Sequence, residues 1–526
     1  MSGSSTIGKA ALVVSAGILL SRVLGWVRNA AILALLGIGR ESSLYITAFT
    51  IPDFLTFLLA GGYLSITLVP LLSRHLVVGD DDETMRTFTA VFRIVGLAFV
   101  VLAGVTIVGA GWIVATVFPE VEDQARLTSL TRIALASQVF FGTGILLMAA
   151  QYAKRRFTLP SLAPLVYNLG IIGGGLVGWA LGDPSPEAFL WGGLVGAAVG
   201  NFGLQALGAH RLGYRLIPST PWRHPAVKEY FTLALPLMLG ISAVALDEQW
   251  PRLFGQYAGE DGAAALASAR TLNMLPVGVI AQAAGVAAYP FLAGLAAEGR
   301  IAEMGSTLLR SVRNSVAVGG LAAGIVGGLT VPIVTLAYGY GEVTSDNTTA
   351  LASLLLFYCV SIPFWPAHQV YTRGFYALQR MWTPVLIGSA VTVVLVPILW
   401  FLVNRNGAAG VAAGSTFGVI LYTVCVGLAW HVLVSRVDAM DMILFALRVL
   451  VVAVGCGLAT FGVSVGLDEA GLPSLIRLGA GSVIGAVVYV AAAQLVGVGE
   501  VRQVLDQVVD RVRRLRHRSE DPATTP

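Results

Sequence analysis

Long apolar runs separated by short polar segments recur along the whole chain. Most runs hold about twenty residues or more, which lets a helix cross ~30 Å of hydrocarbon. The second and the eighth runs are long enough for a tilted or kinked helix. The pattern predicts fourteen membrane-spanning helices, at residues 10–37, 43–73, 88–117, 130–153, 162–182, 187–209, 229–257, 263–297, 312–338, 350–378, 384–404, 409–434, 441–466 and 476–497. The chain is therefore predicted to be an all-α polytopic membrane protein.

A short internal repeat adds a higher level of organisation. Residues 152–160 and 376–384 both read Tyr-Ala-x-x-Arg-x-x-x-Pro, and the same spacing separates Arg28 from Arg252. In this register, helices one to six and seven to twelve are two copies of one unit. An even number of spans gives both copies the same orientation in the membrane. Parallel repeats of this kind build transporters whose site lies between two helix bundles.

The repeat predicts the domain organisation. We expect two six-helix lobes at residues 1–215 and 216–438, related by a pseudo-two-fold axis along the membrane normal. Two further helices, within 439–498, form an appendix to the second lobe. Residues 499–526 place valines and leucines at helical spacing with arginines between them. This favours an amphipathic basic helix on the anionic inner leaflet over a solvated tail.

Composition and charge agree with this class. Hydrophobic residues make up 56% of the 526 positions, charged residues 12%, and the mean hydropathy is +0.79. Lys and Arg gather in alternate connecting segments, most densely at Lys154, Arg155 and Arg156. The positive-inside rule places these segments and both chain ends in the cytoplasm. The expected location is a membrane, with both termini on its cytoplasmic side.

Several arginines fall inside predicted spans: Arg22, Arg28, Arg252 and Arg270. An arginine at the bilayer centre costs at least ~2.5–3.5 kcal/mol on insertion scales, so each one needs a partner or water. Lining a cavity for an anion is one solution, because the guanidinium fork matches phosphate oxygens. Pairing is the other, between Arg28 and Asp53 or between Arg252 and Glu248.

Other chemistry is sparse along the chain. Asp247, beside Glu248, is a candidate carboxylate for coupling to a cation, with membership of an ion-pair cluster as the alternative. No P-loop is present, the six His are scattered, and the three Cys lie inside apolar runs. The pattern predicts a protein that is not an enzyme and has no cofactor and no nucleic-acid partner. The membrane potential or a coupling cation would then supply the energy.

Several segments together resemble the MurJ/MviN family of lipid II flippases, within the multidrug/oligosaccharidyl-lipid/polysaccharide exporter superfamily. They are "SRVLGWVRNAAILALLG", "AFTIPDFLTFLLAGGYLSITLVPLLSRH", "AKRRFTLPSLAPLVYNLGIIGGG", "ARTLNMLPVGV" and "GFYALQRMWTPV". The resemblance covers about residues 10 to 500 and keeps the order and spacing of the motifs. It implies fourteen spans arranged as two six-helix lobes, in agreement with the apolar pattern.

The resemblance also implies roles for individual residues. Arg22, Arg28 and Arg270 match arginines that face the family's central cavity, where they would contact the pyrophosphate of the undecaprenyl-linked disaccharide-pentapeptide. The lipid tail would lie in a groove formed by the helices within 439–498. Membrane lipids are implied partners, and cell-wall synthesis and division proteins are candidate ones.

The sequence departs from the family pattern at three polar positions. Asn29 stands where an Asp is usual, Thr56 where an Arg is usual, and Ser43 where an Asp is frequent. One cavity arginine and its acidic counterparts are therefore absent together. Arg252 and Asp53, which the usual pattern lacks, are candidates to compensate.

These observations predict a flippase that moves lipid II from the inner to the outer leaflet by alternating access, without ATP hydrolysis. A flippase for another lipid-linked glycan is one alternative. A non-transporting scaffold for cell-wall proteins is the other. Three cavity arginines argue against an exporter of cationic drugs, which would need carboxylates in that position.

Overall fold

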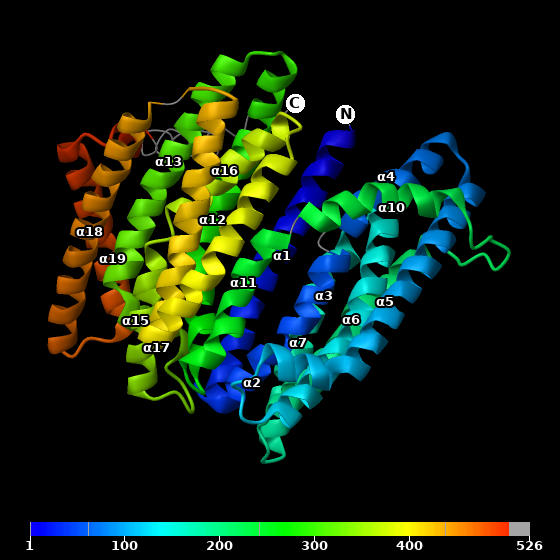
Figure 1. The fold of residues 1–526 in the computed structure, drawn as a ribbon, viewed down its shortest axis with the longest axis horizontal. Coiled ribbons are helices and arrows are strands. Elements are labelled where there is room, and N and C mark those ends of the chain that lie inside the picture. The colour runs from blue at the N-terminus through cyan, green and yellow to red at the C-terminus, as the bar shows by residue number, and fades with distance from the viewer. Residues whose placement is uncertain (1, 61–62, 241, 437, 504–526) are drawn as a thin grey trace, which may run out of the picture. The chain divides into compact units, whose positions relative to one another are not determined.

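The computed structural model describes residues 2–60, 63–240, 242–436 and 438–503. Side chains are described in these ranges except at 2–16, 18–19, 58–60, 63–66, 235–240, 242–247, 282–287 and 439. The described chain folds into helices and contains no strand (Figure 1). The all-α prediction is confirmed. The amphipathic tail predicted for 499–526 lies outside the described residues beyond residue 503.

Packing divides the chain into two units, which are described separately. Unit 1 comprises Met1–Ala267 and Tyr340–Thr344, and unit 2 comprises Ser268–Gly339 and Ser345–Pro526. The α-helices of unit 1 are α1 (Ser2–Leu36), α2 (Arg40–Ala48), α3 (Thr50–Ala60), α4 (Tyr63–Val78), α5 (Asp81–Val117), α6 (Gln124–Ala153), α7 (Thr158–Ala180), α8 (Pro186–Gly196), α9 (Leu204–Arg211), α10 (Pro225–Gly240) and α11 (Ser242–Gly255). A π-helical segment, Ala197–Gly203, joins α8 to α9, and a 3₁₀ turn, Gln256–Ala258, follows α11.

Helix α12 (Gly262–Ala297) crosses the boundary between the units. The helices that follow it belong to unit 2. They are α13 (Ile301–Gly328), α14 (Thr330–Tyr338), α15 (Ser345–Cys359), α16 (Phe364–Ala377), α17 (Trp382–Leu433), α18 (Ala439–Glu469) and α19 (Ser474–Val496).

Each predicted span has a helical counterpart, although several are broken. The second span consists of α2, α3 and α4, and α13 bends by 74° into α14. Gly407 has φ 54° and ψ −135°, so α17 contains two helices on either side of it, as the separate spans 384–404 and 409–434 predict. In the described residues, nine helices are long and apolar enough to cross a membrane, or ten if the bent pair is one span.

The segment at 216–267 packs within unit 1, although the repeat assigns it to the second lobe. Helix α10 contacts α3, α4 and α5, and Glu229 at its start forms an ion pair with Arg74 of α4 at 2.9 Å. Helix α11 contacts α2 and α3. The packing boundary therefore lies after Ala267, and the lobe boundaries derived from the repeat stay a prediction about the internal duplication.

The two copies of the repeated motif share an unusual local geometry. Helices α6 and α16 both end at the Ala of Tyr-Ala, and two residues later Arg155 and Gln379 adopt positive φ values of 54° and 58°. They are the only described non-glycine residues with positive φ. In both copies the following Arg donates its backbone N–H to the carbonyl five residues back, at 2.9 Å. A left-handed residue that closes a helix end in this way is rare without glycine, so the match supports the repeat at the level of the turn.

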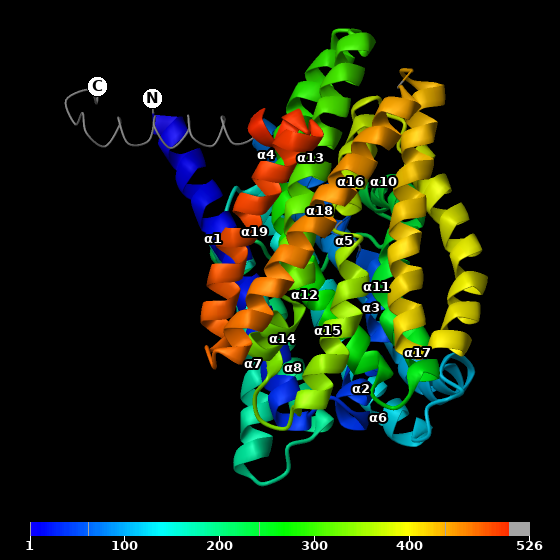
Figure 2. The ribbon, with the colours of Figure 1, turned by 90° about the vertical axis from the view of Figure 1, so that its left-hand side faces the viewer.

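The core of unit 2 is a layer of large side chains where α13, α16, α17, α18 and α19 meet. Trp430 is fully buried with its ring 5.3 Å from that of Phe375. Tyr489 of α19 donates its hydroxyl to the carbonyl of Ala317 in α13 at 2.6 Å. Figure 2 shows α13, α18 and α19 side by side. The lipid-tail groove predicted for the helices within 439–498 is not tested by this packing and stays a prediction.

Helices α7 and α8 approach each other through glycines. A Cβ at Gly174 would lie 2.3 Å from the carbonyl oxygen of Ala188 and 2.7 Å from the Cα of Gly192. Both neighbours are backbone atoms, so the helices would have to separate. We expect Gly174→Ala to lower the thermal midpoint of the purified protein by several degrees. The adjacent Gly173→Ala meets nothing within 4 Å and is the matched control. Equal midpoints for both variants would contradict this account of the packing.

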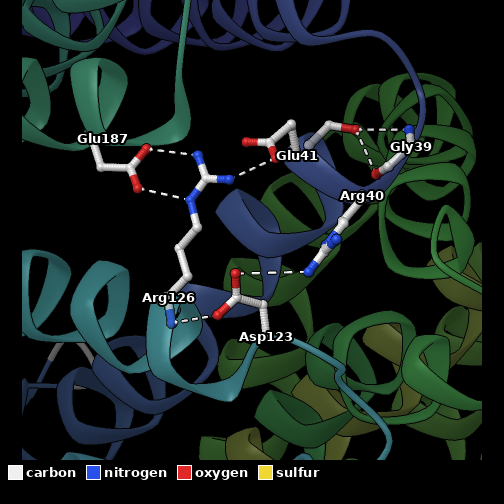
Figure 3. A network of polar contacts seen from close by, with 7 residues as sticks. Gly39, Arg40, Glu41, Asp123, Arg126 and Glu187 are labelled. Carbon is white, nitrogen blue, oxygen red and sulfur yellow. Dashed lines mark hydrogen bonds and ion pairs between the residues drawn. The ribbon is translucent and has the colours of Figure 1, made fainter.

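An ion-pair network fastens three helix starts at one end of unit 1 (Figure 3). Arg126, in the first turn of α6, forms a two-bond contact with Glu187 of α8 at 2.9 and 3.1 Å. Its remaining nitrogen donates to Glu41 of α2 at 2.7 Å. Asp123 caps α6 by accepting from the backbone N–H of Arg126, and it pairs with Arg40 at 3.6 Å. A planar fork held by two carboxylates orients α2 and α8 against α6 more firmly than single exposed pairs do.

Candidate functional site

The polar cluster of unit 1 is centred on Arg28, about two turns before the end of α1. Its Nε and Nη2 donate to Asn29 Oδ1 at 3.1 and 3.0 Å, and its Nη1 donates to Asn168 Oδ1 at 3.1 Å. All three hydrogen bonds that Arg28 donates are therefore accepted by neutral amide oxygens. Among the described residues no carboxylate pairs with Arg28, and the side chain is half-buried. No described carboxylate neutralises the guanidinium, and the three hydrogen bonds hold it in one orientation.

The orientation of Asn168 is fixed by a second hydrogen bond. Its Nδ2 donates to the carbonyl of Pro164, one turn earlier in α7, at 2.9 Å. This contact assigns the nitrogen side of the amide, so the oxygen faces Arg28. Only 5% of Asn168 is exposed, and the side chain is held by the packing of α7 against α1. Asn168 is a buried support that accepts from Arg28 without neutralising it.

Arg252 of α11 is paired, unlike Arg28. Its Nη1 donates to Asp53 Oδ2 of α3 at 2.5 Å and to Gln249 Oε1 at 3.1 Å. The alternatives weighed from the sequence, Arg28 with Asp53 and Arg252 with Glu248, are thus replaced by a bridge between α3 and α11. The bridge forms because α11 packs on α3, so Asp53 faces α11 rather than α1.

The two arginines act on a shared environment. Tyr45 of α2 is buried, Tyr167 of α7 is half-buried, and both lie within electrostatic range of Arg28, Asp53 and Arg252. Two guanidiniums and one carboxylate leave a formal excess of one positive charge around these rings. This excess of positive charge favours an anion.

Thr56 occupies the position where the family resemblance expects an arginine. Its hydroxyl hydrogen-bonds to Gln138 Oε1 of α6 and also reaches the carbonyl of Pro52 at 3.1 Å. Thr56 lies one turn after Asp53 on α3. The missing cation is therefore replaced locally by a neutral hydrogen-bonded pair, and Arg252 supplies a cation one turn away.

The structure places the other predicted residues separately. Arg22 is exposed on α1, and no described residue forms a hydrogen bond or ion pair with it. Arg270 is half-buried on α12 in unit 2, where it has an interaction partner. Glu248 is exposed, and the side chain of Asp247 lies outside the described residues. The binding and coupling roles predicted for these residues stay predictions.

Three amides of the cluster were missed by reasoning from the sequence. Asn168 and Gln138 lie in apolar helices, whereas Gln249 follows Asp247 and Glu248 in α11; all three amides are at most 5% exposed. Attention to charge alone passes over neutral polar residues. An amide inside an apolar run was the available signal, because it needs a hydrogen-bonding partner within the protein. The described residues contain no group of His, Cys, Asp and Glu that could hold a metal ion.

Comparison with known families identifies the chain's relatives. Residues 32–481 match the family model described as "Lipid II flippase MurJ". The chain belongs to this family. The matched range begins after Arg22 and Arg28, so this match does not cover either arginine.

Curated relatives agree with the MurJ family assignment. The lipid II flippase MurJ of Burkholderia cenocepacia is 25% identical over 421 residues, covering 78% of this chain and 81% of the relative. A protein named "Probable lipid II flippase MurJ" from Synechocystis is 26% identical over 441 residues, covering 80% and 81%. The chain therefore spans most of the length of both relatives.

Solved structures support the fold. A lipid II flippase MurJ in an inward closed conformation matches with a TM-score of 0.76 at 17% identity, covering 92% of this chain and 98% of that one. An inward-facing multidrug transporter of the MATE family matches with a TM-score of 0.64, covering 80% and 96%. The MurJ-like chain thus has a fold that also occurs in the wider superfamily.

Proposed function

We propose that this protein moves lipid II, the undecaprenyl-pyrophosphate-linked precursor of peptidoglycan, from the inner to the outer leaflet of the bacterial cytoplasmic membrane. Membership of the MurJ family and the names of its relatives support the cargo. The observation that carries the proposal on this chain is Arg28. It is an oriented guanidinium inside a membrane helix, and its described acceptors are neutral amides.

The chemistry of the site fits a pyrophosphate. Two parallel N–H donors of one guanidinium match two oxygens of a phosphate group, and such charge-assisted bonds are roughly twice as strong as neutral ones. Amide acceptors hold Arg28 in the absence of cargo. An arriving phosphate outcompetes them, because a full negative charge accepts more strongly than an amide oxygen. Carboxylate partners would resist this exchange.

Transport would proceed by alternating access without ATP hydrolysis. The basic segments place both chain ends on the cytoplasmic side in this proposal. Each negative charge of the headgroup that moves outward across an inside-negative membrane gains up to ~2.3 kcal/mol per 100 mV. The membrane potential is therefore a sufficient source of direction. A coupling cation acting through Asp247 or Glu248 is the second option, and it would make transport depend on the cation gradient.

Complementation tests the proposal with the protein as it exists. The full chain is expressed in cells depleted of their own lipid II flippase, and lipid II reaching the outer leaflet is measured with a probe that modifies only the exposed headgroup. Restored growth together with restored exposure is the expected result. Restored exposure of a different lipid-linked glycan, with none of lipid II, would assign the chain to another cargo. Restored growth without exposure of lipid II or of any other lipid-linked glycan would favour the scaffold.

A further inference from the structure

The linker between α9 and α10, residues 212–224, is a loop that projects outward at the edge of unit 1 beside α5 (Figure 1). Arg93 of α5 holds it by donating to the carbonyls of Ile217 at 3.2 Å and Thr220 at 3.3 Å. The backbone N–H of Ile217 donates to the hydroxyl of Thr89 at 3.0 Å. The guanidinium of Arg93 also lies 6.0 Å from the ring centre of Trp222. The linker is therefore a fixed surface feature with a defined tip at the level of Arg93.

The base of the linker lies further toward the end of unit 1. His224 Nε2 is 3.3 Å from Glu83 Oε1, near the start of α5. Glu83 and Arg93 are ten residues apart, which is about 15 Å along a helix. Asp81 and Asp82 belong to the same first turn of α5 as Glu83. These carboxylates lie about 15 Å from Arg93 along α5, although Glu83 contacts His224 and Asp81 is within electrostatic range of Tyr214 at the two ends of the linker.

The tip lies where the lipid-facing side of α5 begins. Leu97, one turn beyond Arg93, is 51% exposed, and Val101 and Val108 further along are 52% and 82% exposed. Exposed aliphatic residues in an unbroken line on a spanning helix face acyl chains. A group at the level of Arg93 therefore lies at the boundary between hydrocarbon and headgroups.

The side chains at this boundary are those of an interfacial anchor. Trp222 is 61% exposed and Leu216 is 48% exposed, although both lie on an ordered loop. Arg215 and Arg223, beside them, are exposed, and neither forms an ion pair or hydrogen bond with a described residue. Tryptophan is enriched at the membrane interface, and arginines next to it attract anionic headgroups at ≈ 1 kcal/mol each.

The neighbouring loop adds positive charge to the same surface. Lys154 donates to the carbonyl of Leu212 at 2.9 Å, and its ammonium lies 5.3 Å from the ring centre of Tyr214. Arg155 and Arg156, which follow it, are exposed. Lys154 thus fastens a second basic segment to the linker.

We propose that the linker 212–224 binds anionic phospholipid headgroups, with Trp222 and Leu216 inserted at the interface and Arg215 and Arg223 on the phosphates. The linker joins α10 to the preceding helices of unit 1, so lipid bound there stabilises this junction. The proposal rests on the membrane-spanning fold and on contacts within unit 1. It is independent of the cargo.

The test uses the purified full-length protein in neutral detergent, with phosphatidylglycerol or phosphatidylcholine added at equal amounts. Ligands that bind the folded state raise the thermal midpoint. We expect a larger rise with phosphatidylglycerol. In Arg215→Gln/Arg223→Gln most of the difference between the two lipids should disappear, whereas Arg215→Lys/Arg223→Lys should keep it. Trp222→Ala should reduce the rise with both lipids.

Control variants distinguish binding at the linker from a general effect of the protein's positive charge. Arg310→Gln/Arg436→Gln removes two exposed arginines of unit 2 and should leave the lipid difference unchanged. Inorganic phosphate should produce no rise; a rise equal to that with phosphatidylglycerol would show a free-anion site and overturn the lipid assignment. An unchanged lipid difference in Arg215→Gln/Arg223→Gln, or an equal loss in the control pair, would overturn it as well.

A depth measurement tests the geometry without relying on stability. A spin label at Leu216→Cys, in a protein lacking Cys359, Cys425 and Cys456, reports whether the linker touches the bilayer. In phosphatidylglycerol vesicles we expect the label to collide more with oxygen than with a water-soluble nickel complex. A label fully accessible to the nickel complex would contradict the proposal.

Discussion

Arg28→Ala is expected to abolish rescue of flippase-depleted cells and to weaken binding of lipid II by at least ~100-fold. Hydrogen bonds to charged groups contribute ≈ 1.5–3 kcal/mol each, and the fork of Arg28 can make two of them to one phosphate. Every 1.4 kcal/mol is a factor of ten in affinity, so losing both bonds accounts for the expected change. The thermal midpoint should fall only modestly, because Asn168 Oδ1 loses its bond from Arg28 but no buried charge is left unpaired.

Two further variants make the Arg28 result specific. Arg28→Lys keeps the charge but not the fork, and it should retain weak binding and partial rescue. Arg405→Ala removes an exposed arginine whose only described contact is with the Phe401 ring, at 6.0 Å, and it should behave as wild type. Binding of lipid II is measured on purified protein. The undecaprenyl lipid without phosphate groups serves as the competitor. Wild-type affinity in Arg28→Ala would remove the observation on which the proposed function stands.

The apolar pattern was sufficient to predict the fold, because a bilayer allows few arrangements of backbone. Every polar N–H and C=O must be paired within the segment, so long apolar runs read directly as helices. The breaks were harder to predict. The division of the second span into α2, α3 and α4 follows from tertiary packing, whereas the break at Gly407 falls in the gap between the predicted spans 384–404 and 409–434.

The sequence pointed to the charged residues of the candidate site but not to the residues that hydrogen-bond to them. Arg28 and Arg252 are conspicuous because arginine is costly in a membrane. Their partners could not be assigned, since the sequence gives no rotation of one helix against another. Asp53 faces Arg252 rather than Arg28, and this choice depends on how α11 packs on α3. Asn168 contacts Arg28 across 140 positions of sequence, and no local pattern connects the two.

Asn168→Asp is expected to impair transport more than Asn168→Leu, although it keeps the hydrogen bond. A carboxylate at position 168 would form a charge-assisted pair with the guanidinium of Arg28. The resulting pair would neutralise the guanidinium and compete with the phosphate for its donors. We expect lipid II binding to fall by about 10- to 100-fold while the thermal midpoint is kept or raised. Asn168→Leu removes one acceptor, so it should lower the midpoint and weaken binding less.

Asn168→Asp should weaken binding more but keep the thermal midpoint, whereas Asn168→Leu should lower the midpoint and weaken binding less. This difference separates a role of Asn168 in positioning Arg28 from a purely structural role. If Asn168 served only to hold α7 against α1, the variant with the lower thermal midpoint would also be the one with the weaker binding.

A double-mutant cycle sharpens the distinction, since residues in direct contact show coupling that distant residues lack. In an Arg28→Ala background, Asn168→Asp should produce no further loss of binding, because the carboxylate has no guanidinium to neutralise. An additional loss of similar size in that background would mean that Asn168 acts independently of Arg28. Wild-type binding by Asn168→Asp alone would show that the site tolerates a neutralised arginine, and the requirement for an uncompensated charge would then fall.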